Sequence, residues 1–312
     1  MNDKLAVIDI GTNTFRLLIC TNNRPEPEVV FRMTQPVRIG HGGISEGRIA
    51  EDAIRRMVDT LSDFRKHIDL HQVPLSYVFA TGTSAIRNAK NSQEVLKVVK
   101  EKTGITIKVI SGDEEAELIY YGIKQAIPMG EDEPSLIMDI GGGSVEFIIA
   151  HATQIFWKKS FEIGGQRMMD KFYQHDPILD IEVSALEQYL SEALEPLRIA
   201  LDEFKPDTLI GSSGTFDTLS DIFCIKNNLI TDNSFKEKPL TKEGFFQIHR
   251  QFLTKNREQR LAIPGMIEMR VDMIVVASCL LNFLMSLYPF RSIRVSNYSL
   301  KEGLLYYHLS SM

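Results

Sequence analysis

The stretch LIMDIGGGSVEFIIA, residues 136–150, decides the fold that this sequence predicts. Two apolar runs flank three consecutive glycines, with Asp139 before the glycines and Glu146 after them. Apolar runs of this length around a glycine turn are typical of two strands that are covered on both faces and joined as a hairpin. The two acids, placed inside strands that otherwise look buried, need a further explanation.

A second stretch, LAVIDIGTNTFRLLI at 5–19, repeats this pattern. Asp9 aligns with Asp139 and Thr14 with Ser144, so the same device occurs twice, 130 positions apart (139 minus 9). A repeated element at the start of each half of a chain predicts two domains of similar fold.

The domain boundary is expected in the turn cluster PMGEDEPS, residues 128–135, because proline, glycine and acidic residues gather there. The predicted domains are 1–127 and 128–312, and the final helix is expected to pack back on the first domain. Strands and helices alternate in both halves, so the fold class is α/β.

Three of the predicted helices bear on the domain organisation. Apolar side chains recur every three or four positions over 48–69. A second helix is expected over 111–127, opened by a capping box of Ser111 and Glu114. The segment 183–204 is predicted to be one long helix.

The composition narrows the classes of function. The chain has 312 residues, a formal net charge of −6 and a pI of about 5.7, which does not suggest binding to nucleic acid or to an acidic membrane. The N-terminus lacks the features of a signal peptide, so a cytoplasmic location is expected. The apolar stretch 273–285 is too short to cross a bilayer and predicts a buried helix, which would suit a homodimer interface as well as a core.

The glycine turns predict phosphate binding, because they expose backbone N–H groups with no side chain in the way. A tight hairpin with a glycine bulge would explain one such turn, but two copies followed by hydroxyl residues favour a phosphate site. A third glycine turn opens a helix, and helix N-termini also bind phosphate. The candidate phosphate-binding residues of the turns are Gly11, Thr12, Asn13, Thr14, Gly141, Gly142, Gly143, Ser144 and Gly214.

Acids beside such turns would repel phosphate unless a cation lies between them. Asp9, Asp139 and Glu146 are therefore expected to hold a hydrated Mg²⁺ that bridges to phosphate oxygens.

The sequence allows two interpretations for each of two further residues. Arg87 lies about one turn into a helix that follows a glycine-threonine loop, and it either clamps phosphate or is a solvated surface residue. Glu115 lies at the edge of an apolar stripe at a helix start. It is either a candidate general base or an exposed acid that favours the helix dipole.

The motifs taken together resemble the exopolyphosphatase/guanosine pentaphosphate phosphohydrolase family, within the superfamily of actin, sugar kinases and heat-shock ATPases. The resemblance runs nearly from end to end of the chain. It departs from the family in the serines of GSSGT, where glycine-richer versions are common. The segments that carry it are DIGTNTFRLLI, ATGTSAIRNA, VISGDEEAELIYYGI, DIGGGSVEFII, GSSGTFDTL and VSNYSLKEGLLYYHL.

The resemblance implies two ribonuclease-H-like, actin-like ATPase domains with an active cleft between them. It implies that Glu115 is the catalytic base and that Asp139 and Glu146 are phosphate-site acids acting with Mg²⁺. It also implies that Asp9, Thr12 and Asn13 belong to the first phosphate loop, Gly141–Ser144 to the second, and that Arg87 contacts phosphate.

The expected function is that of an exopolyphosphatase, which releases phosphate from the ends of inorganic polyphosphate. The chain is short and has no insertion that suggests guanine recognition, which favours polyphosphate over guanosine pentaphosphate. A guanosine pentaphosphate phosphohydrolase is the alternative, and an actin-like nucleotide switch is a second one that gives Glu115 no role.

Overall fold

The computed structural model describes residues 3–22, 27–230, 232 and 235–311. The chain forms two compact units, of which the first runs to Gly122 and takes in the segment from Leu300 onward, while the second is Ile123–Ser299. The predicted division placed the change of domain in the turn at 128–135. In the structure it falls at the end of a helix, and the last helix belongs to the first unit.

The first unit is built on a five-stranded sheet of order β3-β2-β1-β4-β5. Strands β1, β2 and β3 are antiparallel neighbours, whereas β4 and β5 continue the sheet in parallel with β1. The strands are β1 (Lys4–Ile10), β2 (Thr14–Thr21), β3 (Val29–Pro36), β4 (Val78–Gly82) and β5 (Ile107–Val109).

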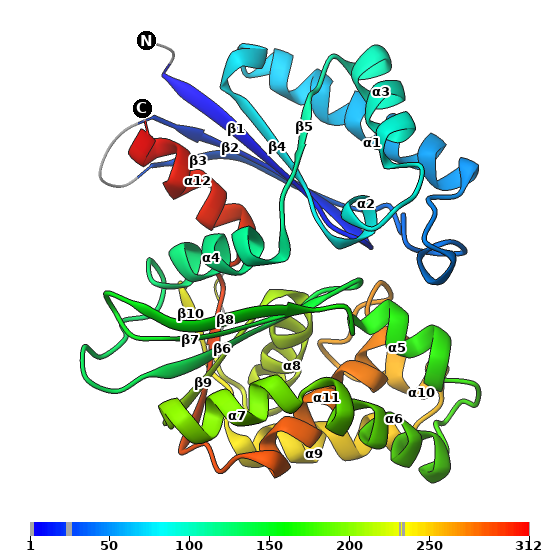
Figure 1. The fold of residues 1–312 in the computed structure, drawn as a ribbon, viewed down its shortest axis with the longest axis vertical. Helices are drawn as coiled ribbons and strands as arrows, with labels where there is room; N and C mark the ends of the chain where they lie inside the picture. Colours follow the sequence, from blue (N-terminus) through cyan, green and yellow to red (C-terminus); the bar gives the residue numbers. More distant parts are fainter. Residues whose placement is uncertain (1–2, 23–26, 231, 233–234, 312) are drawn as a thin grey trace. The chain divides into compact units, whose positions relative to one another are not determined.

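The helices of this unit cover both faces of the sheet. Helices α1 and α3 lie together along one face (Figure 1). The periodic pattern over 48–69 is confirmed, because the apolar residues that recur every three or four positions on α1 are buried: Ala53, Met57, Leu61, Phe64 and Ile68. The helices are α1 (Glu51–Leu70), α2 (Ser84–Arg87), α3 (Ser92–Thr103), α4 (Gly112–Ile123) and α12 (Leu300–Ser311), with short 3₁₀ turns η1 (Ile44–Glu46) and η2 (Leu75–Tyr77).

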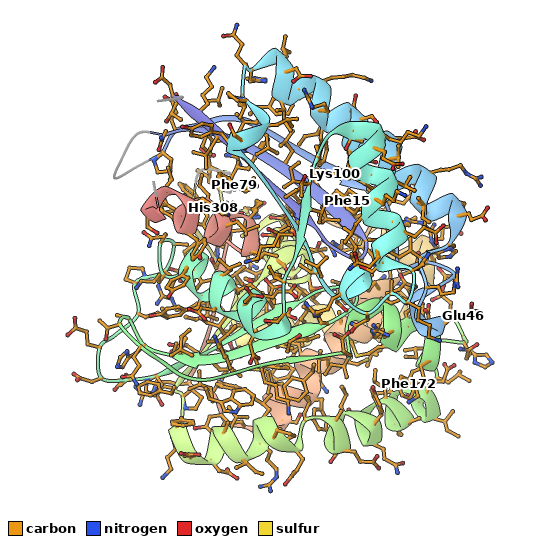
Figure 2. All side chains as sticks on the ribbon, turned by 45° about the horizontal axis from the view of Figure 1, so that its top comes forward. Phe15, Glu46, Phe79, Lys100, Phe172 and His308 are labelled. Carbon is orange, nitrogen blue, oxygen red and sulfur yellow. The ribbon has the colours of Figure 1, made fainter. Side chains whose placement is uncertain are left out.

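Helix α12 is bound tightly to the first unit. Figure 2 shows His308 of α12 against Phe79 of β4, and their rings stack with centroids 3.7 Å apart. A Cβ atom on Gly303 would lie 1.8 Å from the carbonyl oxygen of Leu118 in α4. Any residue other than glycine at this position would therefore force the two helices apart.

The second unit repeats the same sheet and extends it. Its order is β10-β11-β9-β6-β7-β8, in which β8-β7-β6-β9-β11 corresponds to β3-β2-β1-β4-β5. The predicted duplication of a ribonuclease-H-like, actin-like ATPase fold is therefore confirmed at the level of strand order. The strands are β6 (Ser135–Ile140), β7 (Val145–Ala150), β8 (Ile155–Phe161), β9 (Thr208–Ser212), β10 (Glu237–Lys238) and β11 (Ser292–Ser296).

The helices of the second unit form its main core with the sheet. Helices α6, α7, α9 and α11 gather on one face of the sheet (Figure 1). They and their neighbours are α5 (Gly165–Phe172), α6 (Asp180–Ala193), α7 (Glu195–Phe204), α8 (Ser213–Lys226), α9 (Lys242–Thr254), α10 (Arg257–Leu261) and α11 (Met273–Leu287).

The prediction of one long helix over 183–204 was wrong. The chain forms α6 and α7 with a break at Leu194, and Pro196 stands in the first turn of α7. Proline has no N–H to donate and its ring clashes with the preceding turn, so the first helix ends before it and a second begins.

The apolar stretch near residue 280 forms the central helix of the second unit. Helix α11 buries most of its side chains in the core, as the sequence predicts. Within the residues that the structure describes, no helix has both the length and the apolar character needed to cross a membrane.

A buried arginine fixes the loop that precedes α6. Arg260 is fully buried and donates to the Asp176 carboxylate at 2.6 Å and to the Tyr173 hydroxyl at 2.7 Å. The Tyr173 hydroxyl in turn donates to Asp176 at 2.6 Å. This network ties the loop to α10.

Candidate phosphate-binding site

The two glycine hairpins close with the same hydrogen bond. The N–H of Gly11 donates to the carbonyl of Thr14 at 3.1 Å, and the N–H of Gly141 donates to the carbonyl of Ser144 at 3.0 Å. A Cβ atom at either glycine would lie about 3 Å from that carbonyl oxygen, which explains why both turns begin with glycine. The two turns thus share one backbone design.

The carbonyl groups of the second turn are directed toward the start of α5. Those of Gly141, Gly142 and Gly143 accept from backbone N–H groups of residues 164–166 at 2.8–3.2 Å. In a trans peptide the N–H points away from the carbonyl, so the N–H groups of residues 142–144 point to the opposite side. Within the described residues, the N–H groups of Gly142 and Gly143 have no acceptor, which leaves them able to bind an anion.

The first turn is held in a similar way. The carbonyl of Asn13 accepts from the N–H groups of Val37 and Arg38, and that of Thr12 accepts from Gly40. The segment after β3 therefore fixes the first turn as the start of α5 fixes the second. The side chain of Thr12 is buried.

The acids of the two hairpins have different surroundings. Asp9 faces Arg16 across the hairpin, and the Arg16 guanidinium donates to its carboxylate at 3.0 Å. At the matching position of the second hairpin, Asp139 faces Glu146. Asp9 is therefore compensated by a cation within its own hairpin, whereas Asp139 faces a second acid.

Hydroxyl groups satisfy the acids of the second hairpin. Ser212 and Ser213 donate to the two oxygens of Asp139 at 2.5 and 2.6 Å, and Ser160 donates to Glu146 at 2.7 Å. Asp139 is 6% exposed, and no ion pair among the described residues includes it. A buried carboxylate in this condition lacks a compensating cation.

The sequence left open whether Glu115 faces inward. It is 6% exposed and lies 2.8 Å from Nη1 of Arg87, which also donates to the carbonyl of Ile110 at 3.2 Å. Arg87 is thus no freely solvated surface residue. The expected capping box is confirmed, since Ser111 and Glu114 exchange hydrogen bonds of 2.9 and 3.1 Å, and Glu114 is exposed.

The third glycine turn lies at the start of α8. A Cβ atom on Gly214 would lie 1.9 Å from Nη2 of Arg270, so this glycine makes room for a guanidinium that is almost fully buried. Its neighbour Ser213 has a left-handed backbone with φ of 65°.

Three contributors to this region were not predicted from the sequence: Gly164, Ser212 and Ser213. A signal for the serines was present, because the carboxyl ends of parallel strands meet at one edge of a sheet and Ser212 ends such a strand. No group of three or more His, Cys, Asp or Glu residues in the described ranges is arranged to hold a metal by direct ligation.

These observations define a two-domain α/β protein of the ribonuclease-H-like, actin-like ATPase type, with a glycine hairpin at the start of each sheet. The chain belongs to the Ppx/GppA phosphatase family, whose sequence profile matches residues 18–312.

Comparisons with individual proteins agree with this assignment. The crystal structure of an exopolyphosphatase from Cytophaga hutchinsonii is 44% identical, covers 99% of this chain and 98% of its own, and has a TM-score of 0.95. The PPX-GPPA enzyme of Aquifex aeolicus is 26% identical over 97% of this chain and 99% of its own, with a TM-score of 0.79. The guanosine-5'-triphosphate,3'-diphosphate pyrophosphatase of Photobacterium profundum is 26% identical over 98% of this chain, which spans 59% of that relative.

Proposed function

We propose that this protein is an exopolyphosphatase that hydrolyses the terminal phosphoryl group of inorganic polyphosphate. The observation that carries the proposal is the second hairpin, where unused glycine N–H groups lie beside a buried carboxylate that lacks a cation. Together with membership of a phosphatase family and a relative named as an exopolyphosphatase, this combination favours a polyanion bound with a metal.

The glycine turns are assigned to the phosphoryl oxygens. Backbone donors that are fixed in advance stabilise the charge on a transferring phosphoryl group, which is the main requirement of this chemistry. Gly142, Gly143 and Ser144 supply N–H groups in the second unit. The turn of Gly11, Thr12, Asn13 and Thr14 is assigned the same task in the first unit.

Glu115 is assigned as the general base that aligns and deprotonates the attacking water. Arg87 fixes the direction of this carboxylate by a bond of 2.8 Å. The guanidinium has further N–H groups, and we assign these to phosphate oxygens.

Asp139 and Glu146 fit a hydrated Mg²⁺, because hard carboxylate oxygens are its preferred protein ligands and Asp139 lacks a compensating charge. One or two carboxylates with several waters suffice for Mg²⁺ bound with phosphate, so a direct three-residue cage is not required. When bound, the cation neutralises charge on phosphate oxygens. Asp9, which was also expected at the metal, contributes less because Arg16 already compensates it.

The test is phosphate release from long-chain polyphosphate with Mg²⁺ and after chelation. Glu115→Gln is expected to lower turnover by about a hundredfold or more, as for the loss of a general base. Glu114→Gln is the matched control, because it changes an exposed carboxylate on the same turn of α4 and leaves the buried one intact. Absence of phosphate release from the wild-type protein, or normal turnover in Glu115→Gln, would refute the proposal.

A second candidate substrate is guanosine pentaphosphate, which the relative from Photobacterium profundum favours. The chemistry is the same, so the same variants are informative. Initial rates at equal concentrations of polyphosphate ends and guanosine pentaphosphate separate the two substrates.

A further inference from the structure

Asp139 is held by two consecutive serines from the neighbouring strand and helix. Strands β6 and β9 are parallel, and their register places Ser212 directly beside Asp139. Ser212 donates to Oδ2 and Ser213 to Oδ1, so each carboxylate oxygen accepts one hydroxyl proton. This arrangement fixes the rotation of the carboxylate group.

Ser212 does not perform the task that its position in the fold would favour. It is the N-cap residue of α8, where a serine side chain normally accepts from a backbone N–H of the first turn. Here the side chain makes no capping hydrogen bond, and its hydroxyl is turned to Asp139 instead. The first turn of α8 therefore lacks a capping hydrogen bond from the Ser212 side chain.

Ser213 departs from a second local rule. Its φ of 65° lies in the left-handed region, which residues other than glycine seldom adopt. The side chain that makes this conformation costly is also the one that donates to Asp139. Backbone strain that persists beside a functional group indicates a constraint from function.

We propose that Ser212 and Ser213 are positioning residues that orient the Asp139 carboxylate toward a divalent cation. The inference rests on the proposed function, in which Asp139 helps to hold hydrated Mg²⁺. Each oxygen keeps a lone pair beyond the one that accepts from serine, and these lone pairs would be available to a hydrated cation. Groups that orient metal-site carboxylates in this way typically contribute ten- to a hundredfold to metal affinity.

The experiment compares Ser213→Ala with Ser213→Gly. Both variants lose the hydroxyl, but only glycine also relieves the left-handed backbone. Lys205→Gly is the matched control, because Lys205 has φ of 47° and is exposed at the end of α7. Mn²⁺ serves as the probe, and its binding is measured by electron paramagnetic resonance without substrate, together with thermal melting.

Both Ser213 variants are expected to bind Mn²⁺ about tenfold more weakly than the wild-type protein, while Lys205→Gly binds it normally. Ser213→Gly should melt at a higher temperature than Ser213→Ala, so weaker binding in both cannot come from instability. Wild-type affinity in Ser213→Gly, or no Mn²⁺ binding by the wild-type protein, would overturn the inference.

The readout separates this inference from the proposed function. If the wild-type protein binds Mn²⁺ and the serine variants bind it weakly, yet polyphosphate is not hydrolysed, the positioning role stands and the substrate is wrong. If polyphosphate is hydrolysed and the variants bind Mn²⁺ normally, the proposed function stands and the positioning role is wrong.

Discussion

Gly164 controls the shape of the second glycine turn, and its replacement by alanine is the most informative single substitution. Gly164 has φ of −60° and ψ of 161°, a backbone that alanine adopts without strain. A Cβ atom there would lie 2.4 Å from the carbonyl carbon of Gly143 and 2.5 Å from that of Gly142. The substitution therefore acts through a steric clash with the turn and not through backbone strain at residue 164.

The displacement that alanine at position 164 would cause follows from these distances. Ordinary contact of a Cβ atom begins at 3.4 Å, so the turn or α5 must retreat by about 1.0 Å (3.4 minus 2.4). Both sides of the contact are backbone, and hydrogen bonds from residues 164–166 to the turn resist the movement. A misplacement of about 1 Å in groups that position a substrate costs about a hundredfold in rate.

We expect Gly164→Ala to fold and to lose about a hundredfold in kcat/KM for phosphate release from polyphosphate. The assay is steady-state phosphate release at fixed Mg²⁺, with circular dichroism to check the fold. Gly130→Ala is the matched control, since a Cβ atom at Gly130 would meet only a backbone nitrogen at 4.0 Å. A folded Gly164→Ala variant with kcat/KM within twofold of wild type would show that the turn does not position substrate.

Three further substitutions test contacts within the second unit. Gly214→Ala should lower the free energy of unfolding by about 1–3 kcal/mol in urea titrations, because it overpacks against the buried Arg270. Arg260→Met should cost about 1–3 kcal/mol in the same measurement, because it removes the charged donor of the partly buried Asp176 carboxylate. Burial lowers the pKa of His249 from 6.5 to about 4. Between pH 6.5 and pH 4, this histidine is therefore protonated in the unfolded chain but not in the folded one. The free energy of unfolding should therefore fall by up to about 3 kcal/mol from pH 6.5 to pH 4, and more shallowly in His249→Phe.

Features that depend on local sequence were predictable. The hairpins and α1 follow from apolar runs and from helical periodicity, and the capping box follows from the spacing of Ser111 and Glu114. The break between α6 and α7 also has a local cause, although the segment was predicted as one helix, since Pro196 lies inside it. Its effect on the preceding turn outweighs the continuous apolar pattern around it.

Features that depend on pairing between distant segments were not predictable in the same way. Spacing alone placed Glu115 at the edge of an apolar stripe, but its partner Arg87 is 28 positions away and meets it only in the folded unit. Ser212 and Asp139 are 73 positions apart and become neighbours through the register of two parallel strands. A shift of one residue in that register would turn the serine to the other face of the sheet.

The two hairpins have the same backbone but opposite electrostatics, and one register position accounts for the difference. The residue opposite the hairpin aspartate is Arg16 in the first unit and Glu146 in the second. The first hairpin therefore carries its own cation, and its acid is stable without a ligand. In the second hairpin the buried Asp139 accepts from the hydroxyls of Ser212 and Ser213 and forms no ion pair with any residue that the structure describes, so a bound cation would stabilise it as well as the phosphate. The two turns thus share one backbone design, and the arginine at one register position of the first hairpin, where the second has a glutamate, gives them different charges.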